Sequence, residues 1–265
     1  MDTVVKPASL VSTAGSNSLY AVYILWLRQI KRYFRSRSRI IGSLGQPILF
    51  LVALGFGLSS VFSSSGNGNY IQFLAPGIVA MSILFTAIFS GIEIIWDRQF
   101  GFLKETLVAP VSRFNIMFGR TLGGATVAIF QGILVLVISM AIGFRPDIAD
   151  ILPGLVFMAL IALVFTALGT AIASTLEDMQ GFQLIMNFVV MPVFFLSGAL
   201  FPLDTAPPVL KWIAAFNPLA YGVDGLRSAF IHHSLYGAFT DGLVLALIAL
   251  VFMALGAWFF SRIRA

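Results

Sequence analysis

Six long apolar stretches divide this chain, and each is close to the roughly 20 residues that an α-helix needs to cross a bilayer. Charged residues make up only 10% of the 265 residues and the mean hydropathy is +0.97, whereas a soluble domain carries about 25% charged residues. The sequence therefore predicts an all-α integral membrane protein whose six transmembrane helices pack as one bundle. We expect the spans at about residues 40–62, 73–95, 119–142, 151–173, 181–201 and 242–260.

The segment before the first span changes from polar to aromatic and then to basic. Residues 1–17 are small and polar, which predicts a disordered tail, so a single transmembrane domain should comprise residues 18–265. Residues 18–39 place an aromatic set that includes Trp26 on one side of a helix, followed by bases. This pattern predicts an amphipathic helix in the membrane interface, although a plain basic flank of the first span stays open. Its bases include Arg28, Lys31 and Arg32.

The positive charges of the loops predict the orientation of the spans. With the N-terminus inside, thirteen lysines and arginines fall on the inner side of the membrane and three on the outer side. Cytoplasmic loops carry such an excess. We therefore expect a multi-pass protein of the inner or plasma membrane with both termini in the cytoplasm. The net charge of +5 then reflects these loops and lipid contact, and not nucleic-acid binding.

The segment 202–241 is too apolar for a free loop and too interrupted to span the membrane. It contains two short amphipathic pieces, at about 207–216 and 218–233, which meet at an Asn-Pro step. Backbone at membrane depth is tolerated where it is buried in protein or forms helices. We therefore expect short re-entrant helices in the outer leaflet between the fifth and sixth spans.

The sequence lacks the motifs of a self-sufficient enzyme. It has no GxxxxGK[ST] phosphate loop, no HExxH and no cysteine, so we expect no nucleotide, metal or cofactor site in this chain. The adjacent His232 and His233 would point about 100° apart on a helix and are poorly placed to share a metal ion. A membrane-embedded enzyme or a structural scaffold stays open as a minor alternative.

Acidic residues are scarce within the spans. Glu93 lies near the inner end of the second span, where we expect it to pair with Arg98 or Arg120 or to reach the interface. No carboxylate lies near the middle of a span, which argues against an ion-coupled carrier. The third span begins with Gly119 and two further glycines, a spacing that allows close helix approach.

The fifth span offers the side chains best suited to an amphiphilic or apolar substrate. Lipid contact or core packing is the alternative interpretation for each of them. The candidates for a substrate path are Asn187, Met191, Phe194 and Phe195.

Two runs in the chain resemble one known family. Residues 98–120, RQFGFLKETLVAPVSRFNIMFGR, resemble the segment between the second and third spans of type-2 ABC exporter permeases, especially those like the daunorubicin-resistance permease. Residues 191–230, MPVFFLSGALFPLDTAPPVLKWIAAFNPLAYGVDGLRSAF, resemble that family's signature around its fifth span. The six-span plan extends the resemblance over about residues 18–260.

The resemblance implies a permease that pairs with a second copy or a similar permease and binds two separate ATP-binding subunits. ATP and Mg²⁺ would be bound by those subunits. The interfacial helix and the Gln99–Phe114 loop would dock into the ATPase, with a plain cytoplasmic loop as the alternative. Resemblance places these residues in the coupling contact: Phe100, Leu103, Lys104, Glu105, Leu107 and Arg113. The matched outer-leaflet motif comprises Asn217, Pro218, Tyr221, Asp224 and Arg227.

The motif residues are expected to have structural roles, with an Asp224–Arg227 helical pair. Together these patterns predict the membrane subunit of an ATP-driven exporter of a hydrophobic drug, a lipid or a lipid-linked molecule, with antibiotic resistance as one outcome. A polysaccharide or glycolipid exporter of the same superfamily is the first alternative. An ATP-independent carrier is the second.

Overall fold

The computed structural model is an all-helical bundle without strands over the residues that it describes. Those residues are 14–59, 69–102 and 111–262. Five helical stretches are long and apolar enough to cross a membrane, and a sixth apolar helix is shorter. In chain order the helices are α1 (Ala14–Arg35), α2 (Arg37–Gly57), α4 (Tyr70–Phe89), α5 (Ile92–Gln99), α7 (Arg113–Ile142), α8 (Ile148–Thr175), α9 (Met179–Phe195), α10 (Pro208–Ala215), α11 (Pro218–Ile231) and α12 (Ala238–Ser261).

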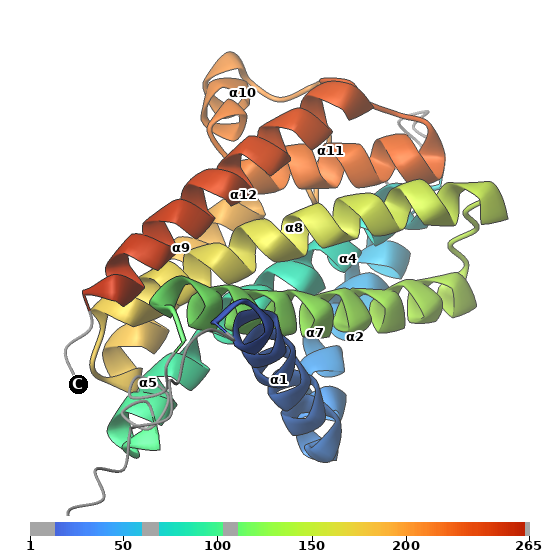
Figure 1. Cartoon of the computed structure of the whole chain (residues 1–265). Helices are drawn as coiled ribbons and strands as arrows, with labels where there is room; N and C mark the ends of the chain where they lie inside the picture. The colour runs from blue at the N-terminus through green and yellow to red at the C-terminus, as the bar shows by residue number, and fades with distance from the viewer. Residues whose placement is uncertain (1–13, 60–68, 103–110, 263–265) are drawn as a thin grey trace, which may run out of the picture.

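Helix α8 forms the centre of the bundle and contacts α4, α7, α11 and α12 (Figure 1). Helix α4 is the other buried span, with 72% of its most apolar window inside the molecule against 17% for α2. Helices α2, α9 and α12 therefore present broad apolar faces to the surroundings. Their exposed side chains include Leu49, Phe56, Phe188, Leu247 and Leu250.

The first helix differs from its predicted bounds at both ends. Helix α1 begins at Ala14, so residues 14–17 are helical and not part of a tail, while residues 1–13 lie outside the described part. It ends at Arg35, and α2 starts after the single residue Ser36. Arg39 is thus in the first turn of α2 and not in the interfacial helix. Helix α1 lies along the first half of α7, since side-chain hydrogen bonds join Ser18 to Asn115 near one end and Tyr33 to Gln131 near the other.

Two predicted spans are interrupted. The expected span 73–95 is two helices, α4 and α5, which are separated at Ser90 and Gly91. At that break a Cβ on Gly91 would lie 2.4 Å from the carbonyl oxygen of Gly169, so the glycines let α8 approach the chain at the turn.

The expected span 181–201 ends early, at Phe195, because the chain turns at Gly198 with φ of +75°. The two short helices expected in 202–241 are confirmed as α10 and α11. Helix α11 is largely buried against α8, α12 and α4, so it belongs to the bundle.

The glycines at the start of α7 provide the close contact that the sequence predicts. A Cβ on Gly119 would lie 2.9 Å from the backbone oxygen of Val22, and one on Gly123 would lie 2.6 Å from the side chain of Gln29. Helix α1 is therefore in near contact with the backbone of α7. Trp26 adds a hydrogen bond, donating its indole N–H to Thr126 at 3.0 Å.

We expect Gly123→Leu to displace α1 from α7. Overpacking costs about 1–3 kcal/mol, which lowers the ratio of docked to undocked α1 at least about fivefold. The chain has no cysteine, so a disulfide between cysteines placed at Ser18 and Asn115, whose side chains are hydrogen-bonded, reports docking. Gly45→Leu is the matched control, because no atom lies within 4 Å of a Cβ there. Equal cross-linking in both variants would contradict this contact.

Candidate functional site

A buried carboxylate on α5 joins three helices at the end of the bundle that carries most of the arginines, here called the basic end. Asp97 is 1% exposed and accepts hydrogen bonds from Arg28 of α1 at 2.6 and 2.7 Å. Arg120 of α7, itself buried, donates to the same carboxylate at 2.6 Å. One anion shared by two guanidinium groups is a strong, charge-assisted arrangement. It connects α1, α5 and α7.

Glu93, one turn before Asp97, forms a second junction. Its carboxylate pairs with Arg32 of α1 at 3.1 Å and with Arg39 of α2 at 3.3 Å. The expected pairing of Glu93 with Arg98 or Arg120 is therefore wrong. Helix α1 packs on α7 and brings Arg32 to the carboxylate, and the first turn of α2 brings Arg39, which the order of the spans in the sequence does not indicate. We call Glu93, Asp97, Arg28, Arg32 and Arg120 the ion-pair cluster.

Arg98 connects α5 to the C-terminal end of α8. Its guanidinium donates to the carbonyl oxygens of Leu176 at 2.8 Å and Ser174 at 3.1 Å. Carbonyls at the end of a helix lack intrahelical partners, and a cation there is favourable. Helix α5 is thus held to α1 and α7 through Asp97 and to α8 through Arg98.

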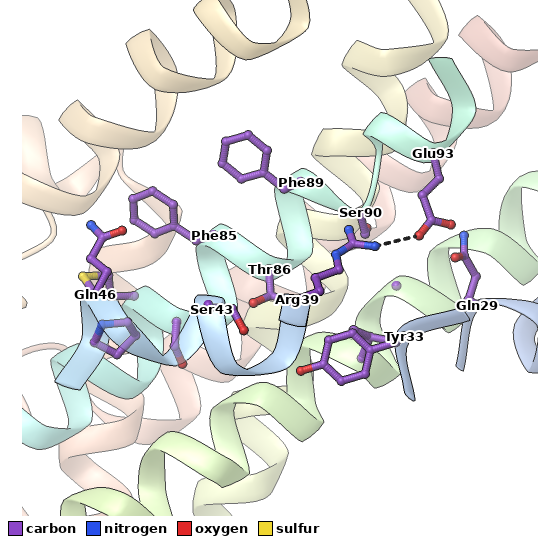
Figure 2. A pocket seen from close by; sticks show the side chains of 16 residues that line it. Gln29, Tyr33, Arg39, Ser43, Gln46, Phe85, Thr86, Phe89, Ser90 and Glu93 are labelled. Atoms are coloured by element: carbon purple, nitrogen blue, oxygen red, sulfur yellow. Dashed lines mark hydrogen bonds and ion pairs between the residues drawn. The ribbon is translucent and has the colours of Figure 1, made fainter. Parts of the chain in front are cut away.

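A cavity of about 220 Å³ lies beside the ion-pair cluster, between α1, α2, α4 and α7. Figure 2 shows the Arg39–Glu93 ion pair at one end of it and Gln46 at the other. Tyr33 donates a hydrogen bond to the buried Gln131 at 2.6 Å, and burial raises the pKa of the Tyr33 phenol above its ordinary value. The lining is polar on α1 and α2 and aromatic on α4, where it includes Phe85 and Phe89. Such a lining suits an amphiphile.

Two of the six predicted coupling residues, Phe100 and Arg113, lie in the described part of the chain. Phe100 follows α5 and is 65% exposed, so its ring is available to a partner. Arg113 starts α7 and donates to the carbonyl oxygen of Ser261 at the end of α12, at 3.1 Å. Leu103, Lys104, Glu105 and Leu107 lie outside the described residues.

Three of the four predicted interfacial residues contact other helices, and the fourth is exposed. Trp26, Arg28 and Arg32 contact α7 and α5, as given above. Lys31 is exposed and lies beside Arg28 and Arg32 on α1. The helix therefore presents bases outward as well as to the cluster, as an interfacial helix requires.

The candidate path residues of α9 do not share one environment. Asn187, Met191 and Phe195 are exposed along one face of the helix. Phe194 is buried at 1% and meets the ring of Phe50 on α2 edge to face. The exposed face is the only part of this set that a substrate or a second permease can reach without rearrangement.

The outer-leaflet motif organises the end of the bundle opposite the basic end. Asn217 caps α11 by accepting from Leu219 N–H, and it donates to the Val193 carbonyl of α9. Pro218 occupies the first position of α11, where its missing N–H has no cost. Tyr221 donates to the Ala215 carbonyl at the end of α10, at 2.8 Å. These residues fix α9, α10 and α11 together.

The expected Asp224–Arg227 pair is wrong, because the structure gives each residue other partners. Asp224 accepts from Ser234 and from the N–H groups of Leu235 and Tyr236, all within 3.0 Å. The Arg227 guanidinium lies 3.7 Å above the Phe73 ring. It donates to the carbonyls of Phe73, Gly198 and Ala199.

The adjacent histidines diverge toward different carboxylates. His232 lies 3.4 Å from Asp150, and His233 lies 3.5 Å from Asp204. Asp147 joins the first pair, so that three ligand atoms lie within 4.8 Å of one another on this largely exposed surface.

Sequence reasoning missed Asp97 and Arg39 as members of the site. The available signal was the spacing of Glu93 and Asp97, which puts two carboxylates on one helix face opposite an arginine-rich helix. Asp97 fell outside the expected span 73–95, and Arg39 fell at the end of the expected interfacial helix 18–39, whereas the structure places them in α5 and α2.

Comparison with known proteins places the chain among transport permeases. The model of the family described as ABC-2 type transporter matches residues 20–231. A putative transport permease, ycf38 of Cyanophora paradoxa, is 29% identical over 77% of this chain and 73% of its own length. Nodulation protein J of Rhizobium leguminosarum bv. viciae is 30% identical over 82% of this chain and 86% of its own length.

Proposed function

Since the chain belongs to the ABC-2 type transporter family, we propose that it is the membrane subunit of an ATP-driven exporter. It is a membrane permease of an ABC transporter, and its family associates with ABC ATP-binding subunits. In the proposed complex two such subunits bind ATP and Mg²⁺. A second copy of this chain, or a similar permease, completes the membrane part.

The proposed orientation puts the basic end and both termini in the cytoplasm of a cell, with the chain in the inner or plasma membrane. The excess of arginine at that end supports it. The ATP-binding subunits then meet the surface formed by α1, the end of α5 and the start of α7.

The observation that carries the proposal is the position of α5. This short helix leads directly into the 100–112 segment, and Asp97 ties it to α1 and α7 while Arg98 ties it to α8. A push on the segment after α5 is therefore passed to three other helices at once. ATP-driven closure of the partner subunits would tilt the bundle through this connection.

The proposed substrate is a hydrophobic drug, a lipid or a lipid-linked molecule. Two features support an amphiphile: the cavity with polar and aromatic walls between α2 and α4, and the exposed apolar face of α9. The cavity holds one arginine and one glutamate at the basic end, which suits a polar head group, while the apolar walls suit a chain.

The test is to purify the tagged chain from its native membrane and identify what accompanies it. We expect a stoichiometric ATP-binding protein. Phe100→Asp combined with Leu103→Asp should reduce its recovery at least about tenfold, because each charge replaces an apolar contact worth more than about 1 kcal/mol. ATP hydrolysis by the complex should fall in parallel.

Phe216→Asp is the matched control, since Phe216 is 72% exposed at the opposite end of the bundle. That variant should keep the ATP-binding protein. Substrate movement by the chain alone in liposomes without ATP would overturn the proposal and favour a carrier.

A further inference from the structure

A buried acid at the opposite end of the bundle has no hydrogen-bond donor beside it in the described part of the chain. Asp241 lies in the first turn of α12 and is 0% exposed. Among the described residues, neither oxygen of its carboxylate meets a hydrogen-bond donor. An ionised carboxylate left in this state has a large desolvation cost, so the group requires a ligand or a proton.

The group that faces Asp241 is a second carboxyl. Asp224 of α11 is also buried, at 7% exposure, and lies close enough to Asp241 for a side-chain hydrogen bond. Two ionised carboxylates offer only acceptors and repel each other. A single proton on one of them turns that group into a donor, removes one negative charge and gives one oxygen of Asp241 a hydrogen-bond partner.

The other groups near Asp241 do not neutralise it. Tyr221 of α11 and Tyr236 of the following loop act on it electrostatically, and their rings lie 4.9 Å apart. The Arg227 guanidinium is directed to three carbonyls, and His232 lies against Asp150 at the start of α8. Arg227 thus acts on Asp224 electrostatically, but among the described residues none of its hydrogen bonds goes to either carboxylate.

We infer that Asp224 and Asp241 form a buried binding site for one proton, held as a carboxyl–carboxylate hydrogen bond between α11 and α12. Asp224 already binds the 234–236 loop through its two oxygens. The shared proton therefore ties the start of α12, the loop and α11 into one unit.

A proton fits this site better than a metal cation. The Asp224 oxygens accept from one hydroxyl and two backbone N–H groups, which occupy the directions that a metal would need. Hard cations take six or more oxygen ligands, and these two carboxylates do not supply them. Asp224 also lines a cavity of about 320 Å³, through which water can exchange the proton.

The direct test is infrared spectroscopy of the full-length chain, purified with the subunits that it retains and labelled with ¹³C at the aspartate carboxyl carbons. At neutral pH we expect the carbonyl stretch of a protonated aspartic acid, lost in Asp241→Asn and kept in the exposed control Asp147→Asn. Asp224→Asn provides a second variant. Absence of the band from the wild-type protein, which requires no variant to fold, would overturn the inference.

The second test is thermal unfolding against pH. Because the folded pair holds a proton that free carboxyls release near pH 4, its contribution to stability is present at low pH and lost as the pH rises. As the pH rises, the unfolding temperature of the wild type should therefore fall relative to that of Asp241→Asn, because the amide of the variant donates to Asp224 at any pH. If Na⁺ or Ca²⁺ stabilises the wild-type protein instead, the site binds a metal ion and not a proton, and the inference is wrong.

Discussion

Asp97→Asn is expected to lower the free energy of unfolding by about 3–5 kcal/mol and to abolish ATP-driven transport. Asp97 is the only anion within hydrogen-bond distance of the buried Arg120 among the described residues, and it also holds Arg28. Removing its charge leaves a buried guanidinium uncompensated. Because the same carboxylate joins α5 to α1 and α7, the loss of stability and the loss of coupling have one cause.

Thermal unfolding of the purified protein and transport by the reconstituted complex measure the two effects. Glu177→Gln is the control, since Glu177 is exposed at the same end of the bundle. Adding Arg120→Gln to Asp97→Asn should recover much of the stability, because the pair is then removed together, but should not recover transport. An Asp97→Asn protein as stable as the control would contradict the role given to the ion-pair cluster.

The apolar stretches were sufficient to predict the fold class and the number of apolar helices. Their positions follow from hydropathy, because a bilayer requires a run of apolar residues of nearly fixed length. The amphipathic pattern predicted α1, and an Asn-Pro step predicted the boundary between α10 and α11. Each of these signals is local in the sequence.

The pairing of charges could not be predicted in this way. Glu93 contacts Arg32 and Arg39, which are 61 and 54 residues away, because the side chains of α1 and of the first turn of α2 reach α5. Sequence spacing indicates which residues share one helix face but not which helix lies opposite.

The same limit explains the wrong Asp224–Arg227 pair. An i,i+3 spacing permits an ion pair, but both side chains bind groups on other segments instead.

Arg227→Met is expected to lower the free energy of unfolding by at least about 3 kcal/mol. The turn after α9 leaves the carbonyls of the buried Gly198 and Ala199 without helical partners, and Arg227 donates to both, at 2.9 and 3.1 Å. Each buried carbonyl that loses a charged donor costs about 1–3 kcal/mol. The cation–π contact with Phe73 is lost as well.

This arginine permits the short α9. A helix of 17 residues is about 25 Å long, less than the roughly 30 Å of hydrocarbon, so irregular backbone would have to complete a crossing at α9. Such backbone is stable only where protein groups satisfy it, and Arg227 does this from α11. Arg227→Lys should therefore be intermediate, because an ammonium lacks the planar fork that reaches two carbonyls. Arg145→Met, at an exposed arginine near the same end, is the control. Equal unfolding temperatures for Arg227→Met and Arg145→Met would show that the turn is held by other contacts.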